Sequence, residues 1–330
     1  MAKHELWELK QMQALPLSIK LRMTQQRIRD WVNEFGTDGV YVSFSGGKDS
    51  TVLLHIVRDM YPDVEAVFVN TGLEYPEIQK FVKTFDNVTI LRPKMRFDEV
   101  IKKYGYPIIS KAVSSKIYAA RNGKEWAMRY VDGTAKMDNQ NKSSFCVEKY
   151  KPLLQTDFRC ADNCCAVMKK SPAKTFARNT GKKPITAQMA AESRQRTAQW
   201  MLKGCNAFES KNQISNPMSF WTEQDVLQYI KENNIHIASV YGEVKFENGK
   251  FSTTGCNRTG CIFCAFGCHL EKEPSRFQRL KETHPKQYEY CIGGGEYDED
   301  GLWKPNKQGL GMGHVFDELN KIYGEGFIKY

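Results

Sequence analysis

The fold of this chain is indicated by residues 40–57, which read Val-Tyr-Val-Ser-Phe-Ser-Gly-Gly-Lys-Asp-Ser-Thr-Val-Leu-Leu-His-Ile-Val. The β-branched and aromatic residues at 40–44 are typical of a short buried strand. A glycine turn follows, and apolar residues return at helical spacing from Thr51 to Val57. The pattern predicts a strand, a tight turn and a helix, an arrangement that points free backbone N–H groups at an anion.

The turn after this strand carries groups that suit a phosphate. Gly46 and Gly47 allow positive φ and a close approach of the ligand to the main chain. Lys48 adds a positive charge, which we expect to face solvent in the empty state, and Ser45 and Ser50 add hydroxyl donors. The spacing excludes a Walker A loop, which has four residues between its first glycine and its Gly-Lys pair. The alternative is a glycine turn that only joins the strand to the helix.

The composition is that of a soluble globular chain with many cysteines. The 330 residues are 41% hydrophobic and 26% charged, and no apolar run approaches the roughly 18 residues that span a bilayer. The N-terminus lacks the apolar core of a signal peptide, so we expect a cytoplasmic protein. The net charge of +10 suits a nucleic acid, or a substrate that carries several phosphates.

Further β-type runs alternate with helical segments along the chain. This alternation predicts an α/β fold with a parallel, doubly wound sheet whose ligands bind at the carboxyl ends of the strands. The loops at 45–50 and 70–77 both follow strands, so we expect them to face one pocket. The remaining strands are expected at 64–69, 88–93 and 183–187, and the main helices at 4–35 (broken at Pro16), 97–104, 276–290 and after the N-cap Thr222.

We expect three parts in the chain. Residues 1–36 form an N-terminal helical segment, residues 37–250 a nucleotide-binding α/β domain, and residues 251–330 a cysteine-rich region that binds a metal. The ten cysteines are clustered, which in the cytoplasm favours metal ligation or redox chemistry over disulfides.

Two groupings of cysteines could hold the metal. The adjacent pair Cys164 and Cys165, with the Cys-x-x-Cys pair Cys261 and Cys264, can supply four soft ligands to a [4Fe–4S] cluster. The local spacing offers a rival set for Zn²⁺ or an iron–sulfur cluster, and mixed sets and the absence of a metal also remain open. The rival set is Cys256, Cys261, Cys264 and Cys268.

From residue 40 to about 270 the chain resembles the phosphoadenosine/adenosine phosphosulfate reductase family of the PP-loop ATP pyrophosphatase superfamily. Four motifs carry the resemblance in the order of the family. They are Ser-Gly-Gly-Lys-Asp-Ser at 45–50, Asn-Thr-Gly-Leu-Glu at 70–74, Cys164-Cys165 with Lys169 and Pro172, and Thr-Gly-Cys-Ile-Phe-Cys at 259–264. The resemblance implies an adenine nucleotide alpha hydrolase-like fold and a [4Fe–4S] cluster at Cys164, Cys165, Cys261 and Cys264.

The resemblance also assigns roles to single residues. Lys48 and Asp49 would act in catalysis, and Lys169 would lie near both the cluster and the nucleotide. Arg194, or Arg196 beside it, could clamp a sulfate or phosphate. The residues expected to bind the nucleotide are Ser45, Gly46, Gly47, Lys48, Asp49, Ser50, Asn70, Thr71, Gly72, Lys169 and Arg194.

Three departures from the family pattern stand out. Asn70 replaces an aspartate, and Ala187-Gln188-Met189 stands where the family has Gly-x-Arg. The family's nucleophilic cysteine, in a C-terminal Glu-Cys-Gly-x-His segment, has only Cys291 as its counterpart here. Cys291 is therefore the candidate nucleophile, although a cysteine that ends an amphipathic helix is more often part of a core.

The resemblance leaves two enzyme functions open. In the first, a thiolate attacks the sulfur of adenylyl sulfate or its 3′-phosphorylated form, and a thioredoxin-type reductant releases sulfite. In the second, the PP-loop binds Mg²⁺-ATP, DNA or tRNA attacks the α phosphate, and pyrophosphate leaves. The adenylated nucleic acid then accepts sulfur from a cysteine desulfurase persulfide or through the cluster. Dnd-type DNA phosphorothioation proteins and iron–sulfur tRNA thiolases resemble this sequence because they combine a PP-loop with cysteine clusters. Either enzyme could be a homodimer, and a non-enzymatic nucleotide sensor or nucleic-acid-binding module is the third alternative.

Overall fold

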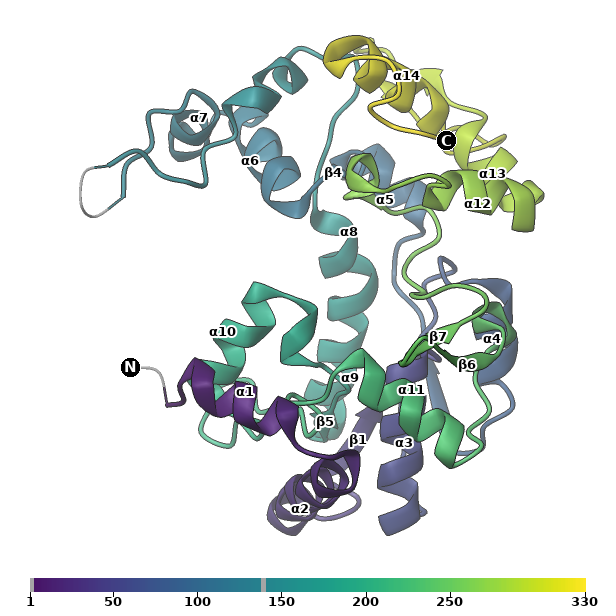
Figure 1. Cartoon of the computed structure of the whole chain (residues 1–330). Coiled ribbons are helices and arrows are strands. Elements are labelled where there is room, and N and C mark those ends of the chain that lie inside the picture. The colour runs from purple at the N-terminus through teal and green to yellow at the C-terminus, as the bar shows by residue number, and fades with distance from the viewer. Residues whose placement is uncertain (1–2, 138–140) are drawn as a thin grey trace. The chain divides into compact units, whose positions relative to one another are not determined.

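The computed structural model of the chain (Figure 1) describes residues 3–137 and 141–330. The chain forms two compact units, each assembled from separate stretches. Unit 1 contains the residues up to Asn70 together with Glu74–Arg92 and Pro172–Gly260, and unit 2 contains Thr71–Leu73, Pro93–Ser171 and Cys261–Tyr330. This division differs from the predicted continuous domain at 37–250, because residues 93–171 pack with the C-terminal residues in a core of their own.

A four-stranded parallel sheet lies at the centre of unit 1, as predicted. Its order is β3-β2-β1-β5, with Val42 paired to Ala66 on one side and to Ile185 on the other. The chain therefore moves away from β1 in one direction and returns on its other side, which places the loop after β1 at a topological switch point. The strands are β1 (Val40–Ser43), β2 (Ala66–Val69), β3 (Val88–Leu91) and β5 (Lys183–Ile185).

The helices of unit 1 pack on this sheet through apolar faces. Helix α3 buries Val52, Leu53, Ile56 and Val57 in the core that β1 and β2 also line. The predicted break at Pro16 separates α1 from α2. The elements are α1 (Leu6–Ala14), α2 (Leu17–Phe35), α3 (Lys48–Met60), α4 (Pro76–Val82), α9 (Ser171–Thr180), α10 (Arg194–Lys203), α11 (Glu223–Glu232) and the hairpin β6 (Val244–Glu247) with β7 (Lys250–Thr253).

A buried ion pair joins α2 to the start of α11. Lys20 Nζ lies 2.8 and 2.7 Å from the two carboxylate oxygens of Asp225, and the Lys20 side chain is 3% exposed. Asp225 Oδ2 also accepts hydrogen bonds from the backbone N–H and the hydroxyl of Thr222, which caps α11 as predicted. The pair thus positions the first turn of α11, which carries Glu223.

Removing Lys20 alone should destabilise unit 1. Lys20→Ala leaves the Asp225 carboxylate buried and unpaired, and we expect a loss of about 3–5 kcal/mol in the free energy of unfolding, measured in urea. The double variant Lys20→Met/Asp225→Asn should lose less stability than the sum of the losses in Lys20→Met and Asp225→Asn, because neither charge is then left alone. The exposed Lys10→Ala serves as the control and should change stability by no more than about 0.5 kcal/mol. Additive losses in the double variant would contradict the coupling.

Unit 2 is mainly helical, with two short sheets. Parallel β4 and β8 pair Ile108 with Ala265, so they join the segment after residue 93 to the cysteine-rich region. Its largest fully buried side chains include Tyr106, Phe158, Phe277 and Phe316. The elements are α5 (Phe97–Tyr104), β4 (Ile108–Ile109), α6 (Lys111–Arg121), α7 (Glu125–Val131), α8 (Asn163–Cys165), β8 (Ala265–Phe266), α12 (Arg276–Thr283), α13 (Pro285–Ile292), β9 (Glu296–Tyr297), β10 (Trp303–Lys304) and α14 (Met312–Tyr323).

The helix predicted at 97–104 is confirmed as α5, but the C-terminal helices differ from prediction. The helix expected at 276–290 is divided at His284 into α12 and α13, because Pro285 has no N–H and begins a new helix well. The glycine-rich tail also contains α14, which buries Val315, Phe316 and Leu319. In the part of the chain that the structure describes, every helix is too short or too polar to cross a bilayer.

Candidate functional site

The loop between β1 and α3 has the geometry that the sequence predicts. It leaves the end of β1 at Ser43 and enters α3 at Lys48, with Gly47 as the N-cap. Gly46 has a φ of +70°, and a Cβ there would lie 2.7 Å from a methyl carbon of Val82 and 2.8 Å from one of Ile78. Glycine is therefore required at position 46 both by its backbone angle and by the packing of α4.

Hydroxyl groups hold this loop in one conformation. Ser50 Oγ donates to the carbonyl of Gly47 at 2.9 Å and accepts the Ser45 backbone N–H at 3.1 Å. The two serine hydroxyls lie 3.0 Å apart, and Thr51 Oγ1 donates to the same Gly47 carbonyl at 3.0 Å. The predicted serines thus shape the loop through contacts within it.

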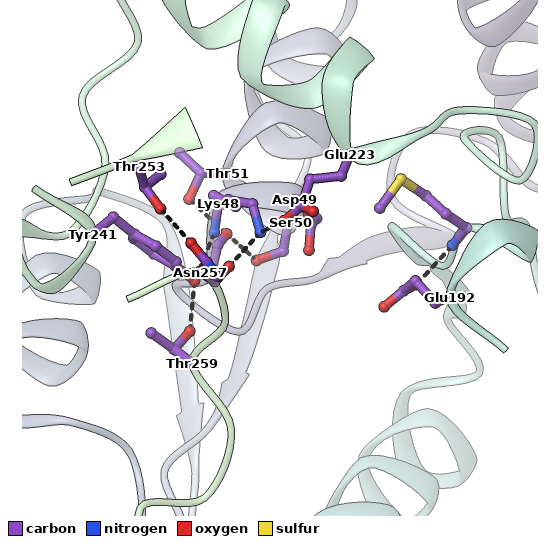
Figure 2. A network of polar contacts seen from close by, with 12 residues as sticks. Lys48, Asp49, Ser50, Thr51, Glu192, Glu223, Tyr241, Thr253, Asn257 and Thr259 are labelled. Atoms are coloured by element: carbon purple, nitrogen blue, oxygen red, sulfur yellow. Dashed lines mark hydrogen bonds and ion pairs between the residues drawn. The ribbon is translucent and has the colours of Figure 1, made fainter. Parts of the chain in front are cut away.

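Lys48 does not face solvent, which corrects the expectation made above. It is 3% exposed, and its Nζ donates to the carbonyl of Asn257 at 2.8 Å and lies 3.0 Å from Glu223 Oε1 (Figure 2). The segment before the Cys-x-x-Cys motif and the start of α11 therefore cover the lysine. Neither contact was anticipated, although Asn257 lies only two residues before the quoted motif at 259–264.

A tyrosine caps the N-terminus of α3. The backbone N–H of Lys48 donates to the hydroxyl oxygen of Tyr241 at 3.2 Å, and that oxygen lies 2.5 Å from Thr259 Oγ1 (Figure 2). Burial raises the pKa of Tyr241 to about 12, so the phenol is neutral near pH 7. An oxygen atom from the protein thus occupies a position at the helix terminus where an anion would bind.

Further charges gather around Asp49. Burial raises the pKa of its carboxyl group, the nearby Glu223 adds to this effect, and Lys48, Arg258 and Arg196 oppose it. Burial and the charge of Arg258 lower the pKa of Arg196, so these two guanidinium groups lie near each other as well. Glu192 forms an ion pair with Arg196, so three cations and three carboxylates gather here, and a multiply charged anion would compete with the carboxylates for the cations.

The other residues that were predicted to bind the nucleotide lie outside the group around Lys48 and Asp49. Arg194, the first residue of α10, is exposed, whereas Arg196 is the arginine near Asp49. The Asn70 backbone N–H donates to Leu91 at the end of the sheet. Thr71 and Gly72 belong to unit 2, where the Ile262 N–H donates to the carbonyl of the adjoining Leu73 at 2.8 Å. Of the loop at 70–77, which was expected to share a pocket with the loop at 45–50, only residues 71–73 are thus assigned to unit 2, whereas residues 70 and 74–77 belong to unit 1 with the loop at 45–50.

The four cysteines of the predicted cluster site gather in unit 2. A hydrogen bond between the thiols of Cys164 and Cys165 raises the pKa of Cys164 and lowers that of Cys165. The negative charges of Cys264 and Cys261 also raise the pKa of Cys164, so both cysteines of the Cys-x-x-Cys pair act on the Cys164 thiol. Lys111 and Lys169 lower the pKa of Cys165, which places the predicted Lys169 beside the pair and adds Lys111, which sequence reasoning missed.

The rival set, Cys256, Cys261, Cys264 and Cys268, is less well matched to a single metal site. Cys256 belongs to unit 1, and the buried Cys268 donates to the carbonyl of Ala265 at 3.0 Å. Within the described residues, no three His, Cys, Asp or Glu side chains form a group that could hold a metal ion as they stand. The four thiols of Cys164, Cys165, Cys261 and Cys264 fit the donor chemistry of an iron–sulfur cluster, whose ligands surround several metal atoms rather than one.

Cys291 occupies the core of unit 2. It is 0% exposed, its thiol donates to the sulfur of Met312 at 3.4 Å, and burial raises its pKa well above the usual value. A buried neutral thiol is a poor nucleophile. The predicted role of Cys291 in catalysis therefore finds no support in this conformation.

Comparison with known proteins decides the family. A family model described as the phosphoadenosine phosphosulfate reductase domain matches residues 39–111 and 124–266. The chain belongs to this reductase family. The matched residues include the PP-loop, both cysteine pairs and the segment that covers Lys48, whereas Cys291 lies beyond them.

Individual relatives of this phosphosulfate reductase family member are distant. An uncharacterized protein of Methanocaldococcus jannaschii is 28% identical over 126 residues, and the match covers 35% of this chain but only 30% of the archaeal protein. A phosphoadenosine 5′-phosphosulfate reductase of Xanthomonas axonopodis pv. citri is 23% identical, over 81% of this chain and 89% of that enzyme. The crystal structure of phosphoadenylyl-sulfate reductase from Candida auris, a phosphate complex, aligns with a TM-score of 0.39 and 16% identity, over 69% and 89% of the two chains.

Proposed function

We propose that this chain binds the phosphates of an adenylyl sulfate nucleotide in unit 1 and catalyses its thiol-dependent reduction to sulfite. The observation that carries the proposal is the PP-loop itself. Two glycines lead into the N-terminus of α3, Lys48 is the first residue of that helix, and Arg196 and Arg258 lie close by. Membership of the phosphosulfate reductase family supports the choice of substrate.

Nucleotide binding would replace contacts that the protein now makes with itself. Phosphate oxygens would take the place of the Tyr241 hydroxyl at the Lys48 N–H and of Asn257 and Glu223 at the Lys48 ammonium. Arg196 and Arg258 would balance the remaining phosphate charge, and Ser45 and Ser50 would keep the loop in shape. Asp49 is part-buried, and its Oδ1 lies 3.8 Å from Lys48 Nζ, where it orients the ammonium group.

We also propose that Cys164, Cys165, Cys261 and Cys264 hold a [4Fe–4S] cluster. When bound, such a cluster supplies electrostatic influence and redox chemistry near its ligands. Lys111 and Lys169 offset the thiolate charge of Cys165, and Arg276 Nη1 donates to the carbonyl of Cys264 at 2.7 Å, which fixes the second pair.

The proposed reaction forms one bond and breaks one bond in each step. A thiolate attacks the sulfur of the sulfuryl group, the S–O bond to the phosphate breaks, and AMP or 3′,5′-ADP leaves with that electron pair. A second thiol, supplied by a thioredoxin-type dithiol, then attacks the thiol sulfur of the S-sulfo group. Sulfite leaves with the electron pair of the S–S bond, and a mixed disulfide then joins the enzyme cysteine to the reductant. The other thiol of the dithiol attacks the reductant's sulfur in this mixed disulfide, the enzyme thiolate leaves with the electron pair of that S–S bond, and the dithiol is oxidised to a disulfide.

Cys256 is the cysteine of unit 1 best placed to be the attacking thiol. The other cysteine of unit 1, Cys205, is buried, whereas Cys256 is part-exposed and its charge acts on Tyr241, the tyrosine that contacts Lys48. We expect Cys256→Ser to abolish sulfite release and Cys291→Ser to retain it, although the second change removes a core thiol. Nucleotide affinity, measured in parallel, should be preserved in both variants. Loss of sulfite release in Cys291→Ser alone, with the fold intact, would instead return the role to Cys291.

Product analysis tests the proposed function. Anaerobically purified protein is given adenylyl sulfate or its 3′-phosphorylated form with a dithiol reductant, and separately Mg²⁺-ATP. We expect sulfite and AMP or 3′,5′-ADP in equal amounts. Pyrophosphate from ATP without sulfite from either sulfated nucleotide would contradict the proposal.

A further inference from the structure

The positive charge of the chain is concentrated in one part of unit 2. Residues 102–151 contain eleven lysines and arginines against four aspartates and glutamates, whereas the whole chain has a net charge of +10. This part comprises the end of α5, helices α6 and α7, and the segment that follows them. It contains none of the PP-loop residues and none of the four cluster cysteines, so neither proposed site accounts for most of this charge.

Aromatic side chains accompany the charge on α7. Trp126 is 47% exposed and lies three and four residues before Arg129 and Tyr130, so the three side chains share one face of the helix. The Trp126 and Tyr130 rings meet edge to face at 6.3 Å. Ala127 and Val131, on the other face, are buried.

Helix α6 adds a cation to the same surface. Helices α6 and α7 lie side by side (Figure 1), and Lys116 Nζ of α6 lies 5.1 Å from the centre of the Tyr130 ring. The exposed Lys124 precedes α7, and the exposed Lys136 follows its last turn. We call the set Lys116, Lys124, Trp126, Arg129, Tyr130 and Lys136 the α6–α7 surface.

We propose that the α6–α7 surface binds single-stranded nucleic acid. Lysine and arginine neutralise a phosphate backbone, and an exposed tryptophan offers a face on which an unpaired base stacks. A base in a duplex is already stacked on its neighbours, so it cannot stack on Trp126. A duplex would therefore bind through charge alone, and Trp126 would add nothing to its affinity. The exposed Trp126 lies edge to face with Tyr130 and among cations. This arrangement therefore favours a single strand over a duplex as the ligand.

The charge component is tested with a neutralised variant. Binding of a fluorescently labelled mixed-sequence single strand is followed by anisotropy at several salt concentrations. Lys124→Gln/Arg129→Gln/Lys136→Gln should weaken binding and reduce the slope of log K against log salt by roughly 2, because each phosphate contact contributes about 0.7. The matched control, Lys231→Gln/Lys245→Gln/Lys250→Gln, removes the same charge from exposed positions of unit 1 and should leave the slope unchanged.

The stacking component needs a different variant. Trp126→Ala should weaken binding roughly 5- to 150-fold without changing the salt slope, and Trp126→Phe should restore most of the affinity. Phe246→Ala, which removes a 59% exposed aromatic residue from the β6–β7 hairpin, is the control. Circular dichroism verifies that every variant is folded.

Three results would overturn the proposal. They are the absence of binding to single-stranded DNA and RNA, equal losses in the unit 1 control variants, and a duplex bound as tightly as the single strand with no effect of Trp126→Ala. The last result would indicate a surface that binds its partner through charge alone. Such a partner would be an acidic protein or a nucleic-acid duplex.

Discussion

Replacing Lys48 by methionine is expected to weaken adenine nucleotide binding roughly 10- to 150-fold, the range that follows from losing a hydrogen bond between charged groups. Methionine keeps the buried aliphatic stem, which matters because Lys48 is 3% exposed and alanine would leave a cavity. The loss should appear in the dissociation constant of AMP or of the sulfated nucleotide, measured by calorimetry. The exposed Lys231→Met on α11 is the matched control and should bind normally.

Glu223→Gln provides a test of opposite sign. The Glu223 carboxylate lies 3.0 Å from Lys48 Nζ and competes with phosphate for it, so neutralising the carboxylate should tighten nucleotide binding several-fold. An unchanged dissociation constant in both Lys48→Met and Glu223→Gln would remove the PP-loop from the binding site. A third outcome is weaker nucleotide binding in Lys48→Met with an unchanged dissociation constant in Glu223→Gln. It would show that the Lys48–Glu223 ion pair is already broken in the free protein.

Replacing Cys264 by serine is expected to abolish cluster binding in unit 2. Removing one of four thiolates leaves the site with three soft ligands, and the visible absorbance and iron content of anaerobically purified protein should fall to near zero. The wild-type protein should contain about four iron atoms per chain. The fall should be specific to iron, and zinc should not replace it.

Two other cysteine variants make this result decisive. Cys146→Ser removes a part-exposed thiol of unit 2 outside the four-cysteine group, and Cys256→Ser removes a ligand of the rival set. Both should keep their iron. If Cys256→Ser loses the metal and Cys164→Ser keeps it, the local set of Cys256, Cys261, Cys264 and Cys268 is the true site. Iron that survives in Cys264→Ser would exclude both assignments.

Much of unit 1 was predictable because its signals are local. The strand at 40–44, the glycine turn and the helix after it follow one another within 18 residues, and backbone preference and apolar spacing decide each of them. The break at Pro16 and the cap at Thr222 are local in the same sense, and so is the helix at 97–104 in unit 2. The two cysteine pairs were likewise recognisable as motifs within a few residues, and their assignment to one cluster stays a prediction.

The remaining features depend on residues that are distant in the chain. The burial of Lys48 beneath Asn257 and Glu223, the Tyr241 cap on α3 and the Lys20–Asp225 pair each join segments about 175 to 210 residues apart. No spacing rule in the sequence links such positions, because the contact arises only after the sheet and helices have packed. The same holds for Arg196, which sequence reasoning placed second to the exposed Arg194.

The sequence by itself determined the nature of the protein: a parallel α/β fold, a glycine turn between its first strand and the following helix, and the phosphosulfate reductase family. These three features depend on short stretches of sequence, because each motif contains all the residues that define it. Only the tertiary structure decided that residues 93–171 pack with the C-terminal region in unit 2 and not with unit 1, and that Cys291 is buried while Cys256 is not. Burial is a property of how distant segments pack, so a cysteine in a core and one at a surface look alike until the chain is folded.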